Sequence, residues 1–240
     1  MTFKGVLGMS DYIDKQTLRY YSIISNIIKQ KKELFSEFEI DMIKDMVLSG
    51  DYPDIYHQDV LRELFDEVGL LPDEENMYET FIQEINNQFD IKNNHIVEVG
   101  GGRFPRLAKR ISLKQNLGTI TVYDPRLDLE EKSNEKMILK REEFTGKQSI
   151  ENCNLIIGLM PCQGINPLLD AAVAYNKDFM VWFCEGGPHG DYYDYFEDDY
   201  EWFDSTMEHL EYQVKKKNMG TVKMKTLSKF SDYPIVYNER

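Results

Sequence analysis

The stretch Ile96-Val-Glu-Val-Gly-Gly-Gly-Arg-Phe-Pro105 decides the fold of this chain of 240 residues. It predicts a buried strand, then a glycine turn, then a helix for which Pro105 is a suitable first residue. The run Thr119-Ile-Thr-Val-Tyr-Asp124 predicts a second strand that ends in an acid. This order is how an α/β sheet builds a pocket for a nucleoside-containing cofactor. The glycines allow the backbone to approach the ligand, and the acid accepts hydrogen bonds from the ribose hydroxyls.

Short β-rich runs alternate with helical patterns after Asp90, which predicts a parallel sheet with crossover helices. Residues 220–227 then alternate in polarity, and residues 234–237 follow a turn, so we expect a terminal antiparallel hairpin at the sheet edge. The predicted parallel strands cover residues 96–99, 119–123, 136–139, 154–159 and 179–183.

The first ninety residues read as helices rather than strands. Apolar side chains recur at helical spacing in four stripes, which fall within residues 18–28, 38–47, 57–68 and 77–89. We therefore expect an all-α N-terminal domain over residues 1–90 and an α/β domain over residues 91–240.

Composition narrows the class of protein. The net charge of −14 disfavours a general nucleic-acid surface, because phosphate neutralisation needs clustered Lys and Arg. The chain has no apolar run long enough to span a bilayer, and its first residues lack the features of a signal peptide. Three cysteines do not make a disulfide framework, and no His/Cys cluster has the spacing of metal ligands. A cytoplasmic protein without a metal is expected.

The segment Glu98-Val-Gly100-Gly101-Gly102 resembles the first motif of class I S-adenosylmethionine (SAM)-dependent methyltransferases, which reads acid-x-Gly-x-Gly. The resemblance covers residues 91–240 and implies a Rossmann-like sheet of five parallel strands followed by a hairpin, with SAM as the cofactor. It also implies that Glu98 organises the site near the cofactor's amino-acid end and that the glycines lie under the ligand.

Two residues near this motif depart from known patterns. Phe104 stands where the methyltransferase family often has a further glycine. Pro105 stands where the dinucleotide fingerprint has its third glycine, which disfavours a pyrophosphate cradle and an NAD-dependent oxidoreductase.

The resemblance extends to the loops after the next strands. Asp124 matches the family's ribose-binding acid, and Glu142 or Glu143 stands where the family often places an acid for the adenine amino group. A pair of solvated acids is the alternative for these two glutamates. The loop after the fourth strand is the family's usual catalytic location, and its residues Leu159, Met160 and Pro161 are expected to line the cofactor.

Pro161-Cys162-Gln163 also resembles the nucleophile motif of the 5-methylcytosine methyltransferases, and Glu185 lies near the position of that family's base-binding Glu. A Cys at a strand-to-helix transition is expected to have its pKa lowered by the helix N-terminus, which favours a nucleophilic thiolate. Against this interpretation, the chain has no room for a target-recognition domain, and its charge does not suit duplex DNA. An inert loop cysteine is the alternative.

All residues of the segment 191–204 are acidic or aromatic. Its periodicity predicts a crossover helix that packs aromatic side chains on the sheet and turns its acids to water. The alternative is a lid that offers aromatic faces and carboxylates to a cationic or amine substrate, hinged at residues 186–190, with His189 as a base.

The sequence therefore predicts a SAM-dependent methyltransferase that acts on a small-molecule or protein acceptor. The alternatives are a non-catalytic cofactor-binding or assembly protein, a pyrimidine C5 methyltransferase that uses Cys162, and an NAD-dependent oxidoreductase. Three roles stay open for the N-terminal helices: capping the pocket, selecting the acceptor, or forming a homodimer. We expect neither a nucleic-acid nor a membrane partner.

Overall fold

The computed structural model describes residues 77–113, 118–129, 135–148, 150–184, 199–227 and 233–240, with scattered residues between 22 and 41. The chain divides into two compact units, Met1–Leu71 and Pro72–Arg240. In the first unit, Ile24 and Ile28 of the first predicted stripe are buried. The third stripe, over residues 57–68, lies outside the described residues.

The second unit is built on a seven-stranded sheet in the described part of the chain, with the order β3-β2-β1-β4-β5-β7-β6. The first five strands run parallel, and β7 pairs antiparallel with both β5 and β6. The strands are β1 (His95–Val99), β2 (Thr119–Tyr123), β3 (Met137–Lys140), β4 (Leu155–Leu159), β5 (Asp178–Trp182), β6 (Thr221–Lys225) and β7 (Ile235–Glu239). The predicted Rossmann-like methyltransferase fold, with its C-terminal hairpin, is confirmed.

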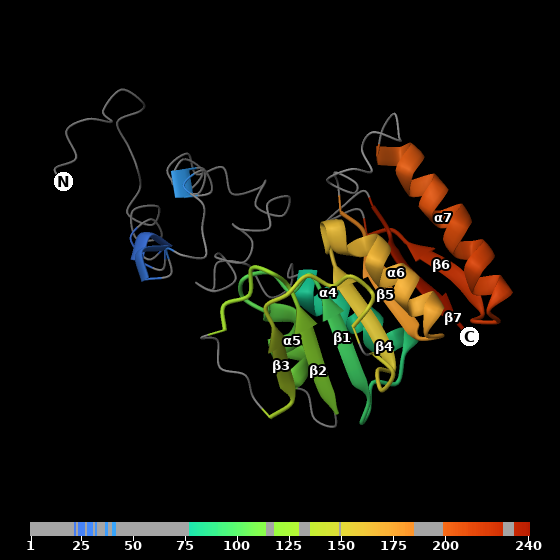
Figure 1. The fold of residues 1–240 in the computed structure, drawn as a ribbon, viewed down its shortest axis with the longest axis horizontal. Helices are drawn as coiled ribbons and strands as arrows, with labels where there is room; N and C mark the ends of the chain where they lie inside the picture. The colour runs from blue at the N-terminus through green and yellow to red at the C-terminus, as the bar shows by residue number, and fades with distance from the viewer. Residues whose placement is uncertain are drawn as a thin grey trace. The chain divides into compact units, whose positions relative to one another are not determined.

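Helices cover both faces of this sheet. Figure 1 shows α6 (Ile165–Ala174) and α7 (Asp199–Lys216) on the near face, with α4 (Met77–Gln88) and α5 (Arg106–Ser112) behind the strands. Every residue of β4 is buried, as are all but the first residues of β1, β2 and β5. A sheet covered on both faces requires near-continuous apolar strands, which is the pattern in these segments.

The helix α4 packs with the sheet. Its Phe81, Ile82 and Ile85 are fully buried, and the Phe81 ring lies 6.2 Å from the Trp182 ring on β5. The sequence placed this helix in the 1–90 domain, whereas it falls within the compact unit that begins at Pro72. That residues 1–90 act as one helical domain stays a prediction. No helix in the described ranges has the length and apolar character needed to cross a membrane.

Candidate functional site

The candidate site lies where the carboxyl ends of the parallel strands meet. Successive strands run outward in one direction from β1 to β3 and in the other from β4 to β5, so the order reverses between β1 and β4. Open α/β sheets bind ligands in the crevice at this switch point. Glu98 on β1 and Leu159 on β4 lie near this edge, and the loops that leave β1, β2, β3 and β4 carry the other predicted site residues.

The glycine loop after β1 is packed tightly against its neighbours. Gly100 and Gly102 have φ of 75° and 71°, in the left-handed region that favours glycine. A β-carbon on Gly100 would lie 2.7 Å from Pro161 Cα, and one on Gly101 would lie 2.2 Å from Val122 Cγ1. Gly100 and Gly101 therefore leave no room for a side chain, because the β4 loop and β2 pack directly against them. Their predicted position under the ligand stays a prediction.

Asp124 follows β2, and its side chain is only 2% exposed. Its Oδ2 accepts the Gly102 N–H at 3.0 Å and Arg126 Nη2 at 3.1 Å. Its Oδ1 accepts the Arg126 backbone N–H at 2.7 Å and Arg126 Nε at 3.2 Å. A carboxylate has about four lone-pair sites, so these four donors fill it.

Glu98 lies on β1 beneath this loop, with its Oε1 3.6 Å from where a β-carbon on Gly101 would lie. The carboxyl-bearing side chain is buried at 2% exposure. Four further charged residues that follow β1 and β2 are also buried: Arg103, Arg106, Asp124 and Asp128. The Asp128 N–H donates to the Arg103 carbonyl at 2.9 Å, which joins the loop after β2 to the glycine loop.

Sequence reasoning did not single out Arg103, Arg106, Arg126 or Asp128. A signal was present, because charged residues directly follow both motifs in Arg103-Phe-Pro-Arg106 and Asp124-Pro-Arg-Leu-Asp128. Nothing in their spacing distinguishes a solvated charge from a buried one.

Glu142 and Glu143 follow β3, and both are exposed. The Glu142 N–H donates to the Lys140 carbonyl at 2.8 Å, and Gln148 Nε2 donates to the Glu143 carbonyl at 2.7 Å. Phe144 beside them is buried, with its ring 5.3 Å from the Tyr123 ring. The parallel sheet brings both glutamates to the edge that carries Asp124, and their adenine role stays a prediction.

The loop after β4 is held in an unusual backbone conformation. Met160 and Cys162 have φ of 51° and 47°, which is uncommon for residues with a β-carbon. The Met160 N–H donates to the Trp182 carbonyl at 2.9 Å, and the Gly164 N–H donates to the Pro161 carbonyl at 2.9 Å. Such conformations persist only where the surroundings fix them, and they cluster at functional sites.

Cys162 is the first residue of the 3-10 helix η4 (Cys162–Gly164), which directly precedes α6. It is partly exposed, and its Sγ lies 3.5 Å from the Met160 carbonyl oxygen and 3.4 Å from Cys184 Sγ. Glu185 and His189 lie outside the described residues.

Only the end of the acidic and aromatic segment is described, as the start of α7. Trp202 is buried, as are Met207 and Leu210 further along the helix. This part of the segment is a crossover helix that packs its apolar face inward, as its periodicity predicts. Residues 191–198 lie outside the described residues, and the lid interpretation stays a prediction.

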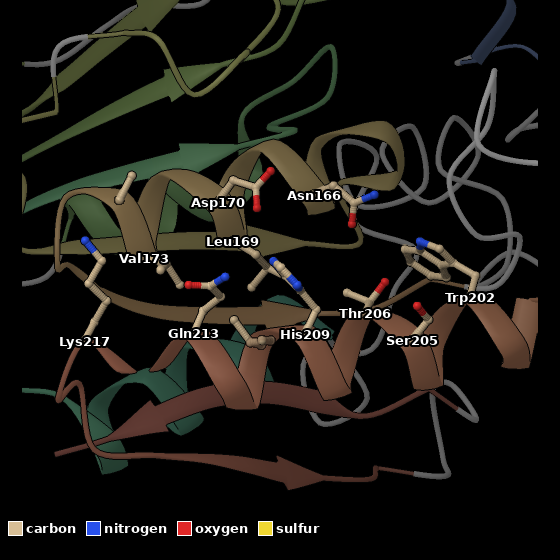
Figure 2. Close-up of a pocket in the computed structure, with 12 residues that line it drawn as sticks. Asn166, Leu169, Asp170, Val173, Trp202, Ser205, Thr206, His209, Gln213 and Lys217 are labelled. Atoms are coloured by element: carbon tan, nitrogen blue, oxygen red, sulfur yellow. The ribbon is translucent and has the colours of Figure 1, made fainter. Parts of the chain in front are cut away.

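A groove of about 520 Å³ lies between α6 and α7. In Figure 2, Asp170 and His209 face it from the two helices, with Trp202 towards one end and Lys217 towards the other. Burial raises the pKa of Asp170, while the nearby His209 opposes the shift. None of the predicted cofactor residues lines this groove. Within the described ranges, no three His, Cys, Asp or Glu side chains are grouped to hold a metal ion.

Comparison with known proteins gives matches to solved structures alone. No family model matches the chain, and no curated protein matches it. A SAM-dependent methyltransferase from Aquifex aeolicus is 14% identical, over 68% of this chain and 89% of its own, with a TM-score of 0.38. The structure described as MtNAS in complex with MTA and tNA is 11% identical, over 96% of this chain and 100% of its own, with a TM-score of 0.46.

A further match is a protein from an antibiotic biosynthesis pathway of Anabaena variabilis, provisionally named a methyltransferase. It is 12% identical over 61% of this chain, with a TM-score of 0.39, and this chain covers 63% of it, just under two thirds. The strand order and terminal hairpin define the fold here as that of the class I SAM-dependent methyltransferases. A shared fold does not by itself assign a reaction.

Proposed function

We propose that this protein binds SAM at the carboxyl edge of β1, β2 and β4 and transfers its methyl group to a small-molecule or protein acceptor. The observation that carries the proposal is the glycine loop at the switch point, which lies between Asp124 on one side and Pro161 on the other. When bound, SAM supplies a methyl group on an already activated sulfonium leaving group. The protein therefore has to position the acceptor in line with that methyl group and keep water away.

The residues at this edge can hold a nucleoside if the Arg126 side chain leaves Asp124. Asp124 is buried at the edge and offers a carboxylate for the ribose hydroxyls, but Arg126 occupies most of its acceptor sites. The Arg126 side chain is 42% exposed, so it can swing into water without breaking the core. Glu98, Leu159 and Met160 complete the proposed site, with Glu142 or Glu143 at the adenine end.

Calorimetry with the full chain tests this proposal. SAM or S-adenosylhomocysteine should bind, and NAD should bind far more weakly. Tight binding of NAD without binding of either adenosyl compound would assign the site to an oxidoreductase instead. Mass spectrometry of ligand that co-purifies with the protein is an independent readout of the cofactor.

A non-catalytic cofactor-binding or assembly protein is the second candidate. The observation that favours it is the capping of Asp124 by Arg126, which closes the ribose position. SAM carrying a labelled methyl group, incubated with fractionated small metabolites and proteins, separates the two candidates. An enzyme moves the label into one fraction, whereas a binding protein retains unreacted SAM.

The pyrimidine C5 methyltransferase interpretation rests on Cys162 alone. The Sγ of the partly exposed Cys162 lies 3.4 Å from Cys184 Sγ. Replacing Cys162 with Ser abolishes methyl transfer if the thiol is a nucleophile, and leaves it measurable if catalysis rests on positioning.

A further inference from the structure

Two cysteine thiols meet where the chain leaves β4 and β5. Cys162 Sγ lies 3.4 Å from Cys184 Sγ, and neither cysteine is in a disulfide. The strands cause this contact, because β4 and β5 are parallel neighbours with Leu159 opposite Trp182. The Met160 N–H also donates to the Trp182 carbonyl at 2.9 Å, so the two chain segments leave the sheet side by side.

The two sulfurs lie close together but are not bonded. A disulfide has an S–S length of about 2.05 Å, so bond formation needs the sulfurs to approach by roughly 1.3 Å. Cys184 is buried at 6% exposure, whereas Cys162 is partly exposed. An external reagent therefore meets Cys162 first, and Cys184 is positioned to react second.

We propose that Cys162 and Cys184 form a reversible disulfide that acts as a redox switch on the proposed cofactor site. The oxidant is a low-molecular-weight disulfide such as oxidised glutathione. The Cys162 thiolate attacks one of its sulfurs, forms a mixed disulfide and expels the first glutathione thiolate. The Cys184 thiolate then attacks the Cys162 sulfur and expels the second. The protein loses two protons and two electrons, and the reagent is reduced to two thiols.

Pro161 connects this chemistry to the glycine loop. It precedes Cys162, and its Cα lies 2.7 Å from where a β-carbon on Gly100 would stand. Movement of Cys162 towards Cys184 therefore displaces the neighbouring Pro161, which packs on Gly100. Interiors are close-packed, so the glycine loop has to follow. This effect on ligand binding rests on the proposed function, whereas formation of the disulfide does not.

Mass spectrometry of the full chain after incubation with oxidised glutathione tests the disulfide. The expected product lacks two hydrogens and retains no glutathione. Cys153 and Cys162 lie in one tryptic peptide, because no Lys or Arg separates them, so fragmentation has to locate the bond. Burial raises the pKa of Cys153 to about 11, which makes this thiol an unreactive internal control.

Matched variants sharpen this test. Cys153→Ser should still form the disulfide, and Cys184→Ser should stop at the glutathione adduct on Cys162. A wild-type product that keeps glutathione, or that links through Cys153, overturns the proposal.

Calorimetry with S-adenosylhomocysteine tests the switch. Oxidation should weaken binding by about tenfold or more, because a displacement of about 1 Å in a site is enough for such a loss. Dithiothreitol should restore the affinity. The Cys184→Ser variant, once its glutathione adduct on Cys162 has been reduced off, should bind like the reduced wild-type protein. Equal affinity of the reduced and oxidised forms overturns the switch. Absence of binding by both forms overturns the proposed function and the switch together, while the mass measurement still decides the disulfide.

Discussion

The carboxylate of Asp124 accepts four hydrogen bonds, and three of them come from Arg126. Two of those three come from the guanidinium and one from the backbone. Because a carboxylate has about four lone-pair sites, the proposed cofactor gains access to the Asp124 oxygens only when the Arg126 side chain leaves. In this conformation Arg126 competes with the proposed cofactor for the same oxygens.

Replacement of Arg126 by Met should therefore tighten the binding of S-adenosylhomocysteine. The Met side chain keeps much of the apolar stem and removes the two guanidinium hydrogen bonds, so two acceptor sites on Asp124 become open. The pair is half-buried, with Arg126 42% and Asp124 2% exposed, and an ion pair that contributes about 1 kcal/mol corresponds to an affinity gain of about fivefold. Isothermal titration calorimetry measures the change.

Two controls accompany the Arg126 variant. Lys140→Met removes a cation from the end of β3, at the same sheet edge, and should leave the affinity nearly unchanged. Asp124→Asn should weaken binding by about tenfold or more, since hydrogen bonds to a charged acceptor contribute about 1.5–3 kcal/mol. Weaker binding by Arg126→Met would assign the guanidinium to ligand contact rather than to competition.

Gly101→Ala should destabilise the fold through one identifiable clash. The added methyl group would lie 2.2 Å from Val122 Cγ1 on β2, so the loop or the strand has to move. Overpacking of this kind costs about 1–3 kcal/mol, which urea denaturation measures as a lower free energy of unfolding.

The double variant with Val122→Ala identifies the cause of the Gly101→Ala effect. Val122→Ala removes the clashing methyl group, so the two substitutions together should cost less than the sum of the two single costs. Strict additivity would place the cost elsewhere, in the backbone rather than in this contact.

The sheet could be predicted from the sequence because strands that are buried on both faces consist almost wholly of apolar residues. Residues 154–159 and 179–183 are almost wholly apolar, and the structure places β4 and β5 within one residue of them. The alternating polarity of residues 220–227 predicted the edge hairpin, although β6 is exposed along almost its whole length, Met224 included. Pro105 precedes α5 by one residue, close to its predicted place at the start of that helix.

The contacts within the candidate site could not be predicted in this way. Asp124 was placed at the end of its strand, but its occupation by Arg126 depends on a turn that brings residues two apart around one carboxylate. The packing of Gly100 against Pro161 joins positions 61 residues apart, and no local pattern encodes that contact. The same is true of the thiol pair, because Cys162 and Cys184 come together only through the register of β4 and β5.

His95 should make the fold less stable in mild acid. Its Nε2 lies 3.0 Å from Thr121 Oγ1, and burial lowers its pKa below the ordinary value of 6.5. Below that value the unfolded chain takes up a proton that the folded chain resists, so the free energy of unfolding falls as the pH falls. The stability that depends on neutral His95 is fully present above about pH 6.5. Its loss in acid is at most about 1.4 kcal/mol for each unit by which the pKa is lowered, and less where solvent screens the group.

Urea denaturation at pH 7.5 and pH 5.5 measures this effect of His95. The His95→Gln variant keeps a polar side chain beside Thr121 but does not titrate in this range, so its stability should change less between the two pH values. An equal change in wild type and variant would show that other groups carry the acid sensitivity.

Asn238 should be among the most sensitive positions in the hairpin. Its side chain is 1% exposed, and its Oδ1 accepts the Phe179 N–H at 2.8 Å. Its Nδ2 donates to Asp178 Oδ1 at 2.9 Å and to the Met219 carbonyl at 3.1 Å. One amide thus joins β7 to the start of β5 and to the turn before β6.

Asn238→Ala removes three hydrogen bonds, although the Asp178 carboxylate keeps its ion pair with Arg240. The buried Phe179 N–H has no route to water without local opening. Each such group costs about 1–3 kcal/mol when buried and unpaired, and Asp178 is partly exposed, so the free energy of unfolding should fall by about 2–4 kcal/mol. The matched control is Glu239→Gln on the same strand, which removes only an exposed ion pair with Lys223 at 3.4 Å and should cost less than about 1 kcal/mol. If both variants lose the same small amount in urea denaturation, the Asn238 amide does not tie the hairpin to the parallel sheet.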